Sequence, residues 1–161
     1  DLSPDHVRVV IHPQSVIHSM VVCRDHSVLA QLGTPDMRVP IAYGLTFPER
    51  IASGAAALDF ASLGALTFEP ADARRFPGLQ LAWRALAAAP GSTAVLNAAN
   101  EIAVAAFLDR TIRFTDIHRI NERTLEAVVP AQGDAASIEA LLALDARARR
   151  HARTLVEGSA R

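Results

Sequence analysis

The stretch HPQSVIHSMVVCRDHSVLAQLGTPDM, residues 12–37, decides the first half of the fold. It holds three of the six histidines, the single cysteine and both methionines of the 161-residue chain. Its apolar, β-branched runs 16–23 and 27–32 predict two strands, and the polar residues 24–26 between them predict a hairpin. Most of the polar chemistry of the front of the chain therefore lies on or beside one hairpin.

Shorter elements are expected on both sides of this hairpin. Residues 7–12, VRVVIH, predict a further strand that Pro13 stops, because proline cannot donate a hydrogen bond to a strand ladder. Residues 33–36 predict a turn. Pro40 suits the first position of a short helix over 41–47, since its missing N–H is not needed there.

The rest of the chain predicts a connector and then a helical bundle. Prolines and glycines interrupt residues 47–76, apart from one strand-like piece at 65–68. Beyond it, apolar residues recur at helical spacing, and the short connections favour an antiparallel bundle. Pro77 is expected to open the first helix, with Leu79, Trp83 and Leu86 buried. The second is expected over 93–110, capped by Ser92 or Thr93, with Val95, Ile102, Ala106 and Phe107 on one side. Three more are expected: one starting at Thr115 over 116–129, a short one over 138–144 after Ser137, and one over 146–157 capped by Asp145.

Composition excludes several classes of protein. Half of the residues are hydrophobic and one fifth are charged, which is typical of a globular protein rather than a disordered one. The predicted hairpin and helices make the expected fold class α+β. No apolar run approaches the roughly 20 residues of a membrane span. A net charge of −1 gives no electrostatic case for binding nucleic acid or an anionic membrane. The single Cys23 excludes an internal disulfide, and residues 1–15 lack a leader pattern, so we expect a cytoplasmic protein.

Residue spacing alone predicts no catalytic constellation. His12 and His18 have no third ligand at a standard zinc spacing, so a metal site, a structural hydrogen bond and a pocket role stay open for them. Cys23, in an apolar run, is expected to be a small buried residue. Residues 33–38 are first of all a tight turn, although an exposed proline and methionine there would suit a flat aromatic ligand. All sixteen basic residues are arginine, which excludes a lysine Schiff base or phosphate-loop lysine.

Two polar groups in the back half favour structural roles. Asn97, Asn100 and Glu101 lie close together on one predicted helix, where asparagine is a poor residue unless its side chain bonds something specific. We expect them to tie this helix to the connector or to a neighbouring lobe. The arginines at 147, 149, 150 and 153 are expected to form a solvated helix face with acidic partners elsewhere on the bundle.

Four segments resemble the 1-deoxy-D-xylulose 5-phosphate reductoisomerase family: VVIHPQSVIHSMV (9–21), VLAQLGTPDMRVPIAYGLTFPERI (28–51), LDFASLGALTFEPAD (58–72) and VLNAANEIAVAAFLDRTIRFTDI (95–117). Nearly the whole chain fits this family in order. The resemblance implies an NADPH- and Mn- or Mg-dependent homodimeric enzyme of the non-mevalonate isoprenoid pathway. That enzyme isomerises its sugar phosphate and reduces it to 2-C-methyl-D-erythritol 4-phosphate.

The resemblance also implies which part of the enzyme is present. Residues 1–46 would be the end of an α/β catalytic domain with part of its β-sheet, 47–76 the connector, and 77–161 a four-helix-type C-terminal bundle. The family's glycine-rich cofactor domain, acidic metal triad and phosphate-binding lysine are missing, and the chain begins at Asp1 without methionine. We therefore expect a C-terminal fragment that is inactive and binds no cofactor alone, whose partners are the missing N-terminal segments and the sugar phosphate.

The matching positions imply a limited set of site residues. Ser15 and His18 would lie at the substrate pocket, and Pro35 and Met37 against the nicotinamide of the cofactor. No catalytic residue and no metal ligand is carried over to this chain. The alternative hypothesis is a non-catalytic helical interaction or assembly module.

Overall fold

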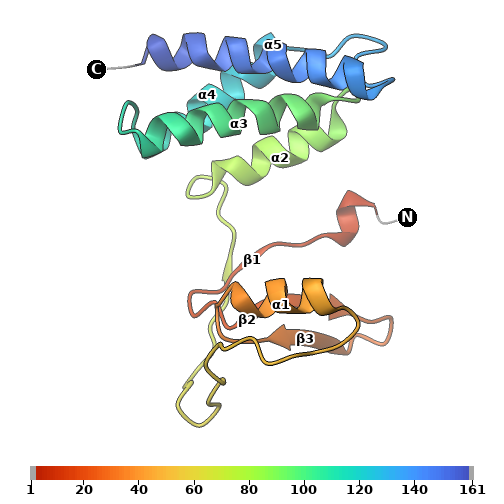
Figure 1. The fold of residues 1–161 in the computed structure, drawn as a ribbon, viewed down its shortest axis with the longest axis vertical. Coiled ribbons are helices and arrows are strands. Elements are labelled where there is room, and N and C mark those ends of the chain that lie inside the picture. Colours follow the sequence, from red (N-terminus) through yellow and green to blue (C-terminus); the bar gives the residue numbers. More distant parts are fainter. Residues whose placement is uncertain (1–2, 160–161) are drawn as a thin grey trace. The chain divides into compact units, whose positions relative to one another are not determined.

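A computed structural model describes residues 3–159, which form helices and two small antiparallel strand pairs (Figure 1). This mixture confirms the predicted α+β class. The elements in chain order are η1 (Pro4–His6), β1 (Val10–Ile11), β2 (Ile17–Val22), β3 (Val28–Leu32), α1 (Arg38–Thr46), β4 (Glu69–Pro70), α2 (Pro77–Ala87), α3 (Ser92–Leu108), α4 (Phe114–Ala127) and α5 (Ile138–Glu157).

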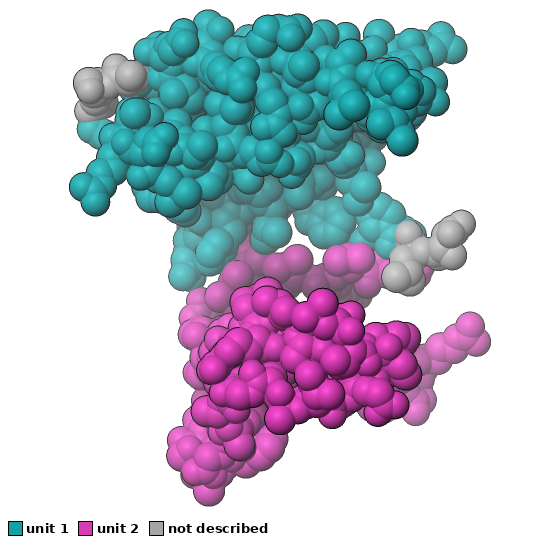
Figure 2. All heavy atoms as spheres, viewed as in Figure 1, with its two compact units in different colours: residues 1–4, 72–161 teal, residues 5–71 magenta. Residues whose placement is uncertain are grey.

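The described residues fall into two compact units, coloured separately in Figure 2. The front unit comprises residues 5–71, and the helical unit comprises residues 72–159 with residues 3 and 4. Most of the segment expected to be a connector thus belongs to the front unit. The predicted three-part division into 1–46, 47–76 and 77–161 remains a prediction about domains.

The front unit is built on the predicted hairpin. Strands β2 and β3 pair antiparallel from Val22↔Val28 to Ile17↔Leu32, and Cys23 N donates to Ser27 O (2.8 Å) across the turn. Within residues 5–71 only Val16, 5% exposed, has a buried side chain. The unit therefore carries a hydrogen-bonded hairpin but little hydrophobic core of its own.

Other front elements differ from the prediction in extent. The strand expected over 7–12 is reduced to β1, because its partner β4 is only two residues long and ends in Pro70, which has no N–H. The strand-like piece expected at 65–68 pairs instead at Glu69–Pro70. Helix α1 begins at Arg38, so Pro40 is its third residue, where the helix has no intrahelical acceptor for an N–H.

Helices α2 to α5 form the predicted bundle. Helix α3 packs most extensively on α5 and α4, and α2 packs on α3 and α4. Alanine is the commonest residue in the interior, and its small side chain lets the helix backbones lie close together. The buried hydrophobic side chains of the helical unit are Leu81, Ala85, Val95, Ala98, Ala99, Ala103, Ala106, Ile112, Ile120, Leu144, Ala148 and Ala152, and the buried polar ones are Ser92, Asn121 and Thr124. Among the described residues, no helix has the length and apolar character that crossing a membrane requires.

Some of the predicted helix ends are wrong. The two helices expected over 138–144 and 146–157 are one helix, α5, since Asp145 bonds Arg149 one turn ahead rather than capping a new helix. Ser137 is its N-cap, as predicted, and accepts from Ala140 N. The cap of α3 is Gly91, so Ser92 and Thr93 are helical residues.

The buried face of α2 also differs from the expected one. It carries Leu81 and Ala85, each 2% exposed, because this side of the helix packs on α3 and α4. Leu79 and Trp83 are half-buried and Leu86 is 51% exposed. The helical spacing was predicted correctly, but the buried face of α2 was predicted on the wrong side of the helix.

Gly91 holds the turn between α2 and α3 in the left-handed region, with φ of 97°. A Cβ atom at this position would lie 2.8 Å from Leu144 Cδ2, closer than side-chain atoms approach. The start of α3 therefore lies directly against α5, and only glycine satisfies both the backbone angle and the close approach.

Replacing Leu144 with alanine should destabilise the helical unit, because Leu144 is fully buried between helices. The expected loss is about 2–5 kcal/mol in the free energy of unfolding, measured by urea denaturation followed by circular dichroism. Leu142→Ala, on the same helix but 63% exposed, is the matched control and should change it by less than about 0.5 kcal/mol. Equal losses in the two variants would contradict the core assignment.

Candidate functional site

His18 lies at an irregularity in strand β2. Ile17 pairs with Leu32 and Ser19 pairs with Gln31, so the register shifts and His18 is the extra residue between two paired ones. Such a β-bulge bends the strand and re-aims a side chain, and bulges are common beside functional sites. The His18 side chain is exposed. The hairpin thus presents this imidazole outside the regular alternation of the strand.

Ser15 has an unusual backbone conformation just before β2. Its φ of 51° lies in the left-handed region, which costs a residue with a side chain about 1–3 kcal/mol. The Ser15 N–H donates to His12 O (3.0 Å) and closes a tight turn. Strain of this kind persists only where surrounding contacts hold it, and it presents the exposed Ser15 hydroxyl at the entrance to the strand.

The turn after β3 carries the other two predicted site residues. Gly33 N donates to Val16 O (3.0 Å), and Thr34 Oγ1 donates to Ala56 O (2.9 Å), so two adjacent residues tie the start of the turn to the front unit. Pro35 is exposed and the Met37 side chain is 70% exposed. Both residues therefore present apolar surface that the described residues leave largely exposed.

The four predicted site residues belong to the same end of the hairpin. The bond from Gly33 to Val16 joins the turn at 33–37 to the residue that follows Ser15. A Cβ atom on Gly33 would lie 3.9 Å from His18 Cε1, so the imidazole packs near the start of that turn. The fold therefore brings Ser15 and His18, expected for the substrate, next to the turn expected for the cofactor.

Asp36 and Arg38 fix the shape of this turn. Arg38 Nε donates to both Asp36 carboxylate oxygens (3.0 Å each), and Arg38 N donates to Asp36 Oδ1 (2.9 Å). The side-chain hydrogen bond from Arg38, and then its backbone N–H, lower the pKa of Asp36 from its usual 3.8 to about 2. The same contact raises the pKa of Arg38 further above its usual range.

The Asp36 carboxylate should titrate with a midpoint near pH 2, followed by its side-chain carbon shift in NMR. Because the folded pKa is lowered, the contribution of this pair to the turn is complete above the unfolded pKa of 3.8 and disappears as the pH falls toward 2. Arg38→Gln should raise the midpoint toward 3.8. A midpoint that does not move in this variant would show that Arg38 does not hold the carboxylate.

His12 and Cys23 have no contacts that indicate catalysis. Since a carbonyl oxygen only accepts, the contact of His12 Nδ1 with Thr67 O (2.8 Å) makes Nδ1 the protonated nitrogen. Its Nε2 atom is buried and has no partner among the described residues. Cys23 is a half-buried free thiol. Within residues 3–159, no group of three or more histidine, cysteine, aspartate or glutamate side chains is arranged to hold a metal ion.

Sequence reasoning missed the residues that hold the Ser15 turn in place. Gln14 bonds the backbone and the hydroxyl of Thr67, and the rings of His12 and Phe68 stack with centroids 4.7 Å apart. The partners are more than fifty residues apart in the chain, so no local spacing indicated them. The one available signal was the strand-like character of residues 65–68.

The polar residues of α3 bond one another and residues of the neighbouring helices α4 and α5, rather than the connector. Asn97 Nδ2 donates to Glu101 Oε1 (2.9 Å), and Asn121 Nδ2 on α4 donates to Asn100 Oδ1 (2.9 Å). Arg149 on α5 bonds both Asp145 (2.6 Å) and Glu101 (2.7 Å), which raises its pKa. The prediction that these residues bond specific partners is confirmed. The partners lie within the helical unit and not in the connector.

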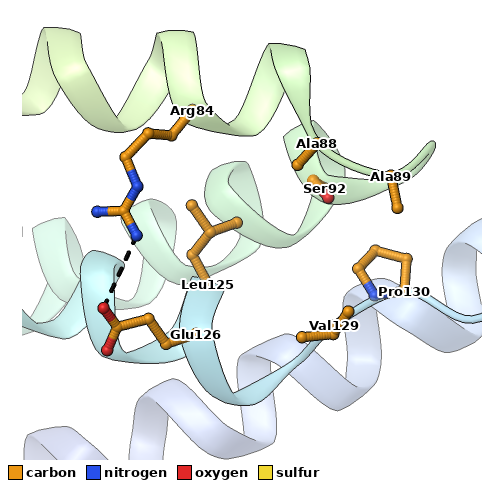
Figure 3. A pocket seen from close by; sticks show the side chains of 8 residues that line it. All are labelled: Arg84, Ala88, Ala89, Ser92, Leu125, Glu126, Val129 and Pro130. Atoms are coloured by element: carbon orange, nitrogen blue, oxygen red, sulfur yellow. Dashed lines mark ion pairs between the residues drawn. The ribbon is translucent and has the colours of Figure 1, made fainter.

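A small pocket lies between α2, α4 and the residues that follow them (Figure 3). Its volume is about 170 Å³, and Arg84 and Glu126 face each other across one side at 3.7 Å. The remaining lining is mostly apolar. Arg84 already has Glu122 and Glu126 as partners, so the pocket has no free charge to select a ligand.

Comparison with known proteins decides the family. Residues 32–151 match the family described as the DXP reductoisomerase C-terminal domain. The chain belongs to this family. The match includes the turn with Pro35 and Met37 and most of the helical bundle, and it confirms the resemblance seen in the sequence.

Individual relatives extend this match to the front of the chain. The chain is 54% identical over 157 residues to 1-deoxy-D-xylulose 5-phosphate reductoisomerase of Rhodopseudomonas palustris strain HaA2, covering 96% of this chain and 39% of the relative. It is 56% identical over 153 residues to the protein of the same name from Cupriavidus pinatubonensis, covering 95% and 38%. The chain spans about two fifths of the length of the curated relatives it matches.

Solved structures give the same result. The chain is similar to 1-deoxy-D-xylulose 5-phosphate reductoisomerase from Zymomonas mobilis in complex with NADPH, with a TM-score of 0.80, 49% identity, and coverage of 93% of this chain and 39% of that one. It is also similar to a DOX-P reductoisomerase in complex with NADPH, fosmidomycin and magnesium, with a TM-score of 0.82, 42% identity, and coverage of 92% and 38%.

Proposed function

We propose that this chain is the C-terminal part of an NADPH- and divalent-metal-dependent reductoisomerase that converts 1-deoxy-D-xylulose 5-phosphate to 2-C-methyl-D-erythritol 4-phosphate. The observation that carries the proposal is the 54% identity over 96% of the chain to an enzyme of that name. The geometry of the hairpin end supports it, because the strained Ser15 and the bulged His18 lie beside the turn that bears Pro35 and Met37.

In this proposal Ser15 and His18 form one wall of the substrate pocket. A serine hydroxyl both donates and accepts hydrogen bonds, and an imidazole does the same through its two nitrogens, so both suit the hydroxyl and carbonyl oxygens of a linear sugar phosphate. Their role is to hold and orient the substrate.

Pro35 and Met37 suit the cofactor. Their exposed apolar surface fits the flat face of a nicotinamide ring, and methionine adapts well to such a ring. NADPH would supply the hydride of the reduction. The proposal assigns the ligands of the Mn or Mg ion to the part of the enzyme outside this chain.

The proposal includes a homodimer and a cytoplasmic location. Val21, Val22, Val28 and Leu29 of the hairpin are all more than half exposed, which supports a further protein surface covering them. That surface would come from the rest of the enzyme or from a second subunit. The single free thiol of Cys23 is typical of a protein from a reducing compartment.

The proposal is tested by completing the enzyme. The N-terminal part of the Rhodopseudomonas palustris relative, joined to this chain, gives a full-length protein that we call the joined enzyme. It should oxidise NADPH when 1-deoxy-D-xylulose 5-phosphate and Mg²⁺ are added, followed by NADPH absorbance, whereas the 161-residue chain alone should not. Light scattering should give the joined enzyme the mass of two subunits.

Two outcomes would contradict this proposal. Turnover by the 161-residue chain alone would show that the reactive groups lie within it. A folded joined enzyme without activity, next to an active full-length relative, would favour the alternative of a non-catalytic assembly module.

Variants of the joined enzyme test the individual site residues. Ser15→Ala and His18→Ala should each raise KM for the sugar phosphate about tenfold, the effect of losing roughly 1.4 kcal/mol of hydrogen bonding. Met37→Ala should instead raise KM for NADPH, roughly fivefold for about 1 kcal/mol of lost apolar contact.

Matched controls come from the same unit. Ser62→Ala removes another exposed hydroxyl, and Met20→Ala removes the second methionine, which lies within β2. Both should leave the two KM values within twofold of the unmodified enzyme. If Met37→Ala and Met20→Ala affect KM for NADPH equally, the assignment of Met37 to the cofactor is wrong.

A further inference from the structure

The turn that carries Ser15 receives its side-chain support from one short segment, residues 67 and 68. His12, at the start of the turn, donates through Nδ1 to Thr67 O (2.8 Å). Its ring stacks on Phe68, with centroids 4.7 Å apart and the planes 17° from parallel. The first residue of the turn is thus held by both a hydrogen bond and a ring contact.

Gln14, the residue before Ser15, is held by Thr67 through both ends of its amide. Gln14 Nε2 donates to Thr67 Oγ1 (2.9 Å), and Thr67 N donates to Gln14 Oε1 (3.2 Å). Thr67 Oγ1 also lies 3.2 Å from Gln14 Oε1. Because the amide bonds a backbone group and a side-chain hydroxyl at once, its orientation relative to residue 67 is fixed.

Ser15 sits directly beyond this amide in a conformation that needs support. Its φ of 51° is unfavourable for serine, and its backbone N–H bonds His12 O within the same turn. On its other side Val16 is buried and accepts from Gly33 N. The position of the Ser15 hydroxyl is therefore set by Val16 on one side and by the contacts of Gln14 with Thr67 on the other.

We infer that Thr67 is a positioning residue for the substrate pocket, which holds the Ser15 hydroxyl in place for the sugar phosphate through the amide of Gln14. This inference rests on the proposed function. It assigns a role to the segment before β4 that neither the motifs around Ser15 nor the sequence spacing indicated. Thr67 itself does not contact the substrate.

A purely structural role of Thr67 would give a different result in kinetic and stability measurements. If Thr67 only anchored residues 65–68 to the front unit, its removal would lower stability and leave the Michaelis constants unchanged. If it positions Ser15, its removal raises KM for the sugar phosphate and leaves KM for NADPH unchanged, because Met37 belongs to a different turn. The ratio of the two KM values therefore separates the two roles.

The test uses the joined enzyme with Thr67→Val, which removes the hydroxyl and keeps the side-chain shape and the backbone N–H. KM for 1-deoxy-D-xylulose 5-phosphate should rise about three- to tenfold, as expected for one hydrogen bond, while KM for NADPH stays within twofold. Thr67→Ser restores the hydroxyl and should restore KM. Thr154→Val, which removes a threonine hydroxyl bonded to Arg150 O on α5, is the matched control and should leave both KM values unchanged.

A double variant shows whether the effect passes through Gln14. Gln14→Ala should raise KM for the sugar phosphate at least as much as Thr67→Val, and adding Thr67→Val to it should cause no further rise. Additive effects would mean that Thr67 acts by another route and would overturn the inference. If Thr67→Val does not fold, Gln14→Ala, which changes an exposed side chain, tests the inference by itself through its KM for the sugar phosphate.

The remaining outcomes are distinguishable. An active joined enzyme in which Thr67→Val changes only the melting temperature overturns the inference and leaves the proposed function standing. An inactive but folded joined enzyme contradicts the proposed function, and the inference falls with it.

Discussion

One backbone hydrogen bond, from Gly33 N–H to the Val16 carbonyl, holds together the end of the hairpin on which the candidate site is built. Before Val16 the chain makes the strained turn at Ser15, and after it the strand bulges at His18. Beyond Gly33 the chain turns toward Met37. Regular pairing at this one point lets three irregular segments share a fixed frame, and Val16 anchors them as the buried side chain of the unit.

The two units are stabilised by different means. The helical unit has a buried interior of alanines with a few larger side chains, and ion pairs such as that of Arg149 with Glu101 join its helices. The front unit depends on hydrogen bonds and turns, and it leaves much of its apolar surface exposed, Leu29 at 66% among them. The two units thus differ in how much apolar surface they bury within the chain itself.

Local patterns in the sequence predicted the elements that local forces determine. The β-branched runs located the hairpin, Pro77 located the start of α2, and Ser137 located the cap of α5. The predictions that were wrong concern features that depend on residues distant in the sequence or on neighbouring helices. Asp145 looked like a cap, but Arg149 engages it inside a continuous helix, and no sequence pattern marks the buried side of α2 without its neighbours.

The candidate site follows the same division. Its four residues came from motifs shared with a family, and physical pattern alone had left His18 with three open roles. The bulge at His18 arises from pairing between two strands, so it is not visible in one of them. The contacts of Gln14 with Thr67 join positions fifty-three residues apart, where only the folded chain shows that the two meet.

Gly91, at the start of α3, lies against helix α5, which is distant from it in the sequence. The space that a side chain would need there is already filled by Leu144. A larger residue at position 91 would therefore need both a left-handed backbone and a displaced Leu144 side chain. Because Leu144 is fully buried in the core shared by α3 and α5, the turn between α2 and α3 and the packing of α5 depend on each other.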